Sequence, residues 1–268
     1  MKRAWMAVLI LAVAVMLPSP VSAAVEITPT VVTAFEKLTA AAPADTAGKL
    51  RSRYAEFVET QAKERSSDQE IASTRTRAEE TRLEVAKRMK EWDTLKLSRL
   101  EKQVKELKER RQPLFDSYSL LQQQLSVAKS LKSKSAITLT QAQLNALKIP
   151  VQLAREEIKQ KEASLKEAKA ARTAHLKKVR SVLAEVDSVN LKLKTERSKA
   201  SAANKIVTAE SKVFSAAARK GDASGTLASL NRLSPSARDT LAAKQRMLEL
   251  ERKRKGVVEQ ALSLLPAS

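Results

Sequence analysis

The chain has 268 residues, 43% of them hydrophobic and 30% charged, and its 50 basic against 30 acidic residues give a formal net charge of +20. It contains no cysteine and one histidine, which excludes thiol chemistry, cysteine zinc sites and histidine metal clusters. With only 4 glycines, 8 prolines and 3% aromatic residues, the composition is typical of long helices and argues against a thick compact core.

Residues 1–23 have the pattern of a secretory signal peptide. Lys2 and Arg3 precede an apolar run, and the small residues Val21-Ser22-Ala23 predict cleavage after Ala23. An uncleaved anchor helix is the alternative, but the apolar run is shorter than the roughly 20 residues of a membrane span. Cleavage would leave 48 basic residues and a net charge of about +18 on an extracytoplasmic protein with no later membrane span.

The remaining chain divides at its turn-forming residues. Residues 24–47 predict an N-terminal helix, starting at Thr28-Pro29, and a linker after Pro43. A first long helix follows over 48–132, then a loop over 133–139, a second long helix over 140–220, and a turn with a C-terminal helix over 221–268. Pro113 and Pro150 lie within the long helices and predict kinks.

The second long helix carries an unbroken heptad pattern from Leu144 to Leu193. At alternate spacings of three and four residues, 12 of its 15 seam positions are apolar, and a matching run extends from Leu97 to Ala128. Two helices of similar length joined by a short loop must lie antiparallel. The predicted fold is therefore all-α: a long antiparallel coiled-coil helical hairpin, with short N- and C-terminal helices packing at its base.

The sequence offers little for catalysis. His175 occupies a seam position near Arg172, where it is either a pH-sensitive, partner-contacting residue or a polar residue that fixes the register of the seam. The adjacent acids Glu79-Glu80 and Glu156-Glu157 point about 100° apart on a helix and so form no catalytic pair. No glycine-rich phosphate loop is present, and we expect neither an enzyme nor a cofactor or metal site.

The most informative charge feature is a stretch without acids. Between Ser117 and Arg155 there is no Asp or Glu, and this is where the predicted hairpin reverses. Candidate contacts for an anionic partner in it are Lys129, Lys132, Lys134, Lys148 and Arg155, with Ile137, Leu139 and Ile149 as apolar neighbours. The alternative is that a tip rich in serine, glutamine and lysine is merely well solvated. A secondary basic cluster, Arg252, Lys253, Arg254 and Lys255, lies in the last helix.

These features predict a secreted, non-enzymatic coiled-coil structural or adaptor protein of the bacterial cell envelope. Its partner would be an anionic cell-wall polymer or an envelope protein, bound electrostatically, with contact to a membrane surface and homodimer formation left open. Nucleic acid is not expected, because aromatic residues do not interleave with the basic ones. The alternative functions are an extracytoplasmic holdase chaperone or a regulator of a cell-envelope enzyme.

Overall fold

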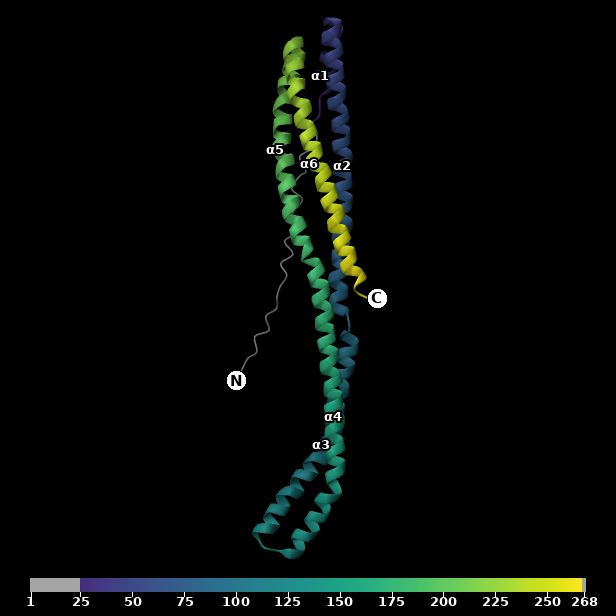
Figure 1. The fold of residues 1–268 in the computed structure, drawn as a ribbon, viewed down its shortest axis with the longest axis vertical. Helices are drawn as coiled ribbons and strands as arrows, with labels where there is room; N and C mark the ends of the chain where they lie inside the picture. Colours follow the sequence, from purple (N-terminus) through teal and green to yellow (C-terminus); the bar gives the residue numbers. More distant parts are fainter. Residues whose placement is uncertain (1–24, 267–268) are drawn as a thin grey trace. The chain divides into compact units, whose positions relative to one another are not determined.

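The computed structural model describes residues 25–266, and 93% of these residues are helical, with no β-strand among them. The all-α prediction is therefore confirmed, while the predicted signal peptide, 1–23, lies outside the described residues. The six helices are α1 Pro29–Ala41, α2 Ala44–Glu91, α3 Thr94–Ser130, α4 Lys134–Leu183, α5 Glu185–Lys220 and α6 Ala223–Ser263 (Figure 1).

The chain divides into two compact units. Among the described residues, the first unit comprises 25–76 and 189–253, and the second comprises 77–188 and 254–266. Helices α2, α5 and α6 each contribute residues to both units, so neither unit is a continuous piece of the sequence.

The first unit is a bundle to which four helices contribute. Its principal core, drawn from α1, α2, α5 and α6 in turn, is Val31, Phe35, Leu38, Leu50, Phe57, Val207, Phe214, Ala218, Leu230, Leu233 and Ala237. Phe35, Tyr54 and Phe214 form an aromatic group, in which the Tyr54 and Phe214 ring centroids lie 5.9 Å apart at an interplanar angle of 13°. Burial, and then the Glu36 carboxylate, raise the pKa of the Tyr54 hydroxyl. Helix α1 thus packs with α2 and α5.

A buried ionic group joins α2 to α6 in the same unit. The Lys244 ammonium donates to Glu64 Oε1 at 2.6 Å and to Asp68 Oδ2 at 2.7 Å. The side chains of Lys244 and Glu64 are 3% and 2% exposed, so both charges have lost nearly all their contact with water. Such a group is stable only because each charge compensates the other.

A tight turn connects α5 to α6. Gly221 has the left-handed conformation (φ 74°), its N–H donates to Ala218 O, and the Asp222 N–H donates to Ala217 O, which is the Schellman arrangement at a helix C-terminus. The Asp222 carboxylate then accepts a hydrogen bond from the Gly225 N–H at 2.9 Å, which caps α6 and lowers the pKa of that carboxyl. The whole turn between α5 and α6 therefore consists of Gly221 and Asp222.

In the second unit, α3 and α4 pair along their lengths. Three ion pairs cross between them, Glu101–Lys169, Lys108–Glu162 and Arg111–Glu157, and the partner's number falls as the first number rises, which defines an antiparallel pair. Every seam position predicted between Leu144 and Leu193 is buried or half-buried except Lys161, although the last two, Val189 and Leu193, belong to the first unit. Every position of the run from Leu97 to Ala128 is also buried or half-buried. A separate core joins Val85, Val179, Val186, Val257, Val258, Ala261 and Leu265.

Several helix boundaries differ from the predicted ones. The first long helix, predicted over 48–132, begins at Ala44 and is interrupted at Trp92-Asp93, where Asp93 is left-handed (φ 56°). The predicted loop over 133–139 is replaced by a three-residue turn, Leu131–Ser133. Helix α3 ends at Ser130, and α4 starts at Lys134 because Ser133 already has the extended backbone of an N-cap residue. The second long helix, predicted over 140–220, starts at Lys134 and is interrupted at Ala184.

The C-terminal helix is not short. It runs for 41 residues and passes through Pro235. Leu230, Leu233 and Ala237 on either side of this proline are fully buried, and their packing outweighs the one backbone hydrogen bond that proline removes. Helices α3 and α4 likewise continue through Pro113 and Pro150.

Candidate functional site

The acid-free stretch forms one end of the α3–α4 pair within the second unit. We call the exposed residues of the range 117–155 the tip surface; it comprises the end of α3, the turn Leu131–Ser133 and the start of α4. Its five predicted cationic residues, Lys129, Lys132, Lys134, Lys148 and Arg155, are all exposed. Among the described residues, no carboxylate lies within ion-pair distance of any of them. This contrasts with the other half of the α3–α4 pair, where cations and acids alternate and bridge the two helices.

The turn of the tip surface has the same geometry as the turn at Gly221, with a different residue at its key position. The Lys132 N–H donates to Lys129 O at 3.1 Å and the Ser133 N–H donates to Ala128 O at 3.2 Å, so Lys132 occupies the left-handed position of a Schellman motif (φ 53°). Glycine is the residue that this position favours, because a Cβ crowds the following carbonyl there. The sequence therefore keeps a cation at a position whose backbone disfavours it.

Replacing Lys132 by glycine should stabilise the chain. Relief of the left-handed strain should raise the free energy of unfolding by up to about 1 kcal/mol, reduced by the greater freedom of glycine in the unfolded chain. Chemical denaturation followed by circular dichroism measures this change.

The matched control is Lys129→Gly, which removes the same charge from an ordinary helical position in the last turn of α3. It should lower the free energy of unfolding by about 1 kcal/mol, because glycine is a poor helix former. Equal effects of the two substitutions would show that the backbone at Lys132 is not strained.

The secondary basic cluster is largely engaged within the protein. Arg252 pairs with Glu70 at 2.8 Å, Arg254 is buried and lies 3.3 Å from Glu79, and Lys255 lies 3.4 Å from Glu259. Lys253 is exposed and makes no ion pair with another described residue. Three of these four charges therefore face carboxylates of their own chain, and we place the candidate site at the tip surface.

His175 also has partners within the second unit. Its Nε2 lies 2.7 Å from the Leu264 carbonyl oxygen, and its ring packs on Trp92 with a centroid distance of 4.2 Å. The neighbouring Arg172 donates to the Trp92 and Lys90 carbonyls, which the end of α2 leaves without helical partners. This geometry matches the register-setting interpretation, because both residues hold the chain at the interruption between α2 and α3.

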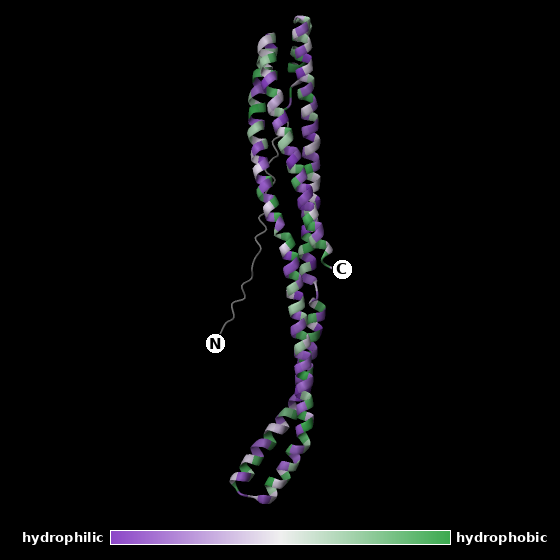
Figure 2. Ribbon diagram, viewed as in Figure 1, coloured by the Kyte–Doolittle hydropathy of each residue, from purple (hydrophilic) through white to green (hydrophobic). Residues whose placement is uncertain are grey.

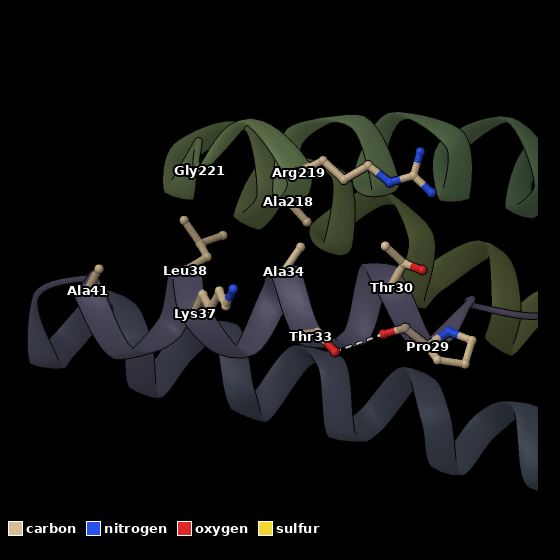
Figure 3. Close-up of a pocket in the computed structure, with 10 residues that line it drawn as sticks. All are labelled: Pro29, Thr30, Thr33, Ala34, Lys37, Leu38, Ala41, Ala218, Arg219 and Gly221. Carbon is tan, nitrogen blue, oxygen red and sulfur yellow. Dashed lines mark hydrogen bonds between the residues drawn. The ribbon is translucent and has the colours of Figure 1, made fainter.

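An open groove of about 790 Å³ lies between α1 and the end of α5 in the first unit (Figure 3). Lys37 and Arg219 bring two cations to its walls, and the Thr33 hydroxyl donates to the Pro29 carbonyl of its own helix. None of its ten lining residues is a carboxylate or histidine. General acid–base catalysis therefore lacks a pair of proton-transfer groups in this groove.

Most of the exposed apolar residues of the tip surface are not among those predicted from the sequence. The predicted residues Leu139 and Ile149 are 63% and 65% exposed, whereas Ile137 is half-buried. The structure adds Leu120, Val127, Leu131 and Leu153, each more than half exposed. Hydrophobic and hydrophilic residues alternate along the ribbon of α3 and α4 (Figure 2). Leu120, Val127 and Leu153 lie on the helices but outside the heptad seam. The sequence signal that could have identified them is therefore the set of large apolar residues that the seam does not include.

Among residues 25–266, no helix combines the length and apolar character of a membrane span. Within that range no cluster of three or more histidine, aspartate and glutamate side chains could hold a metal ion. A comparison of the chain with models of protein families, with curated proteins and with solved structures finds no match.

Proposed function

We propose that this chain is a secreted, non-enzymatic structural or adaptor protein of a bacterial cell envelope. Its α3–α4 pair would be the far part of a long antiparallel coiled-coil hairpin that presents the tip surface to an anionic envelope partner. Three kinds of partner have the required charge: an anionic cell-wall polymer, an acidic envelope protein and the acidic headgroups of a membrane surface.

The observation that carries the proposal is the charge of the tip surface. Five exposed cations, none of them in an ion pair with a described residue, lie in a range that contains no acid. Unneutralised like charges attract a polyanion over about one Debye length, roughly 8 Å at physiological salt. The lysine at the left-handed position 132 supports the same interpretation, because it keeps a cation where glycine would be more stable.

Replacing all five cations of the tip surface by glutamine should weaken binding to isolated bacterial cell walls at least tenfold at about 0.1 M salt. Each lysine or arginine near an anionic surface contributes about 1 kcal/mol to binding. Five together contribute more than the roughly 1.4 kcal/mol that a tenfold loss of affinity requires. Co-sedimentation of residues 24–268 with the walls measures the affinity. For the unaltered protein, raising the salt to about 0.5 M should release it, because screening then extends only a few Å.

The control variant removes five exposed lysines that make no ion pair with a described residue and lie elsewhere in the chain: Lys177, Lys178, Lys192, Lys194 and Lys212. It has the same net charge as the tip variant and should bind as the unaltered protein does. Equal losses in the two variants would mean that only total charge matters, and binding that salt does not change would contradict the electrostatic mechanism.

The second candidate function, a holdase chaperone or a regulator of an envelope enzyme, is favoured by the exposed aliphatic residues of the tip surface. These would contact a client or partner protein through apolar surface. The five-cation variant should then keep its ability to suppress client aggregation, whereas replacement of Leu131 and Leu139 should abolish it.

A further inference from the structure

Six large aliphatic side chains of the tip surface are exposed to solvent. They are Leu120, Val127 and Leu131 at the end of α3, which are 54%, 57% and 73% exposed, and Leu139, Ile149 and Leu153 on α4, which are 63%, 65% and 67% exposed. Single exposed leucines are ordinary, but a contiguous group of them marks an interaction surface.

On each helix these side chains share one face. At 100° per residue, Leu120, Val127 and Leu131 fall within about 40° of one another, since Leu131 still has a helical backbone. Leu139, Ile149 and Leu153 fall within about 80°. Measured in the direction of helical rotation, each group precedes the buried seam of its helix by about 110° to 140°. We call the two groups together the aliphatic face.

The cations lie on the other side. Lys129 follows the seam of α3 by about 70°, and Lys148 and Arg155 follow the seam of α4 by about 60° to 80°. In an antiparallel pair, equal rotational offsets on both helices point to the same side of the plane through the two axes. The tip surface therefore has an aliphatic face on one side of that plane and a cationic face on the other.

Within the tip surface, the exposed side chains that accompany the aliphatic face are uncharged. Gln123 and Gln124 on α3 lie at angles within about 60° of Leu120, and Ser135, Ala142 and Ala146 on α4 lie between the angles of Leu139 and Ile149. An apolar and uncharged face opposite a lysine and arginine face is the pattern of an element that lies in the plane of a membrane interface. The long basic side chains can then reach around to the lipid headgroups.

Other binding partners would contact only one of the two faces of the tip surface favourably. A dissolved polyanion would neutralise the cations and leave the aliphatic face in water. A second copy of the tip would cover the aliphatic face but would leave the cations of both copies without an anionic partner, because the range 117–155 contains no carboxylate. An acidic lipid bilayer offers anionic headgroups to the cations and an apolar acyl region to the aliphatic face.

We propose that the tip surface docks on a bilayer of acidic phospholipids, with the six aliphatic side chains at the boundary between headgroups and acyl chains. The inference rests on the proposed function, a cationic tip that binds an anionic envelope partner, and it names that partner. The cations Lys129, Lys132, Lys134, Lys148 and Arg155 attract the headgroups, and the aliphatic face distinguishes a bilayer from a dissolved polyanion.

The test uses residues 24–268 and vesicles of phosphatidylcholine with or without about 30% phosphatidylglycerol. The apparent affinity of the protein for the acidic vesicles, measured by co-sedimentation, should be at least tenfold higher than its affinity for the neutral ones. The triple variant Leu131→Gln, Leu139→Gln, Ile149→Gln keeps every charge, and it should bind acidic vesicles at least tenfold more weakly because it loses apolar contact with the acyl region.

The matched control places the same three substitutions at exposed aliphatic positions elsewhere, Leu83→Gln, Leu191→Gln and Ile206→Gln, where the side chains are 67%, 69% and 52% exposed. It should bind as the unaltered protein does. As a direct measure of insertion, the fluorescence of Leu139→Trp should be quenched by brominated acyl chains, and that of Leu191→Trp should not. Circular dichroism checks that each variant keeps its helix content.

The outcomes separate the two proposals. The docking of the aliphatic face would be overturned if the triple variant still bound acidic vesicles and the fluorescence of Leu139→Trp were not quenched. Electrostatic binding by the cations of the tip surface would then remain. Binding to cell walls with none to acidic vesicles would overturn the lipid partner and leave the proposed function standing. Binding to neither would overturn both.

Discussion

Lys244→Met is expected to lower the free energy of unfolding by about 3–5 kcal/mol, a loss typical of breaking a buried ion pair from one side. The substitution removes the ammonium that lies 2.6 Å from Glu64 and 2.7 Å from Asp68. The Glu64 carboxylate, 2% exposed, would then be buried without a compensating charge. Urea denaturation followed by circular dichroism, at neutral pH, measures the loss.

The control for this experiment is the triple variant Lys244→Met, Glu64→Leu, Asp68→Leu. Apolar side chains of similar volume in place of a whole buried ionic group are often neutral or stabilising, so most of the lost stability should return. If Lys244→Met alone cost less than about 1 kcal/mol, the group would be hydrated in solution and not buried as described. Recovery in the triple variant would show that the intact ionic group adds little net stability compared with apolar packing, and that the loss in Lys244→Met comes from the uncompensated carboxylates.

Phe214→Ala is expected to destabilise the protein by about 3–5 kcal/mol, the range found for deleting a buried phenylalanine ring. Phe214 is fully buried in the first unit, and its ring centroid lies 5.7 Å from that of Phe35 and 5.9 Å from that of Tyr54. Because these rings come from α1, α2 and α5, the cavity would loosen three helices together. The midpoint of urea denaturation should fall accordingly.

Phe214→Leu is the matched variant, because it retains an apolar side chain in the same place and loses only part of its volume. It should cost less than about 1.5 kcal/mol if the site repacks around it. A small effect of Phe214→Ala, with Phe214→Leu equal to it, would mean that the aromatic group contributes little to holding α1 against α2 and α5.

The sequence was sufficient for the features that depend on local pattern. The heptad seam from Leu144 to Leu193 is a repeated apolar spacing, and a buried or half-buried side chain lies at every position of it except Lys161. The turn at Gly221 was recognisable because glycine readily adopts the left-handed conformation that a helix C-terminus needs.

Other features depend on contacts between distant residues. The pattern around Lys244 is that of a solvated lysine, and only the approach of α6 to Glu64 and Asp68 makes it a buried charge. Pro235 resembles a helix start until the burial of Leu233 and Ala237 on both sides is known. The interruption at Trp92-Asp93 has no proline or glycine to announce it, since aspartate can also take the left-handed conformation that forms it.

The candidate site could be predicted from the sequence only in part, because one of its features also depends on contacts between distant residues. A run of sequence without acids is visible by inspection, so its five cations could be named. The aliphatic face could not, because it requires knowing that α3 and α4 are antiparallel in a defined register, which places Val127 and Leu139 on the same side.

The discontinuous make-up of the second unit has a consequence for the order in which the protein acquires its structure. Helices α3 and α4 are joined by a three-residue turn and can pair as soon as both are synthesised. The core of the same unit, however, joins Val85 and Val179 to Val257 and Ala261, contacts between residues far apart in sequence that form late because a long loop must close. A nascent chain would therefore display a paired tip before the segment after residue 254 has been synthesised to complete the unit.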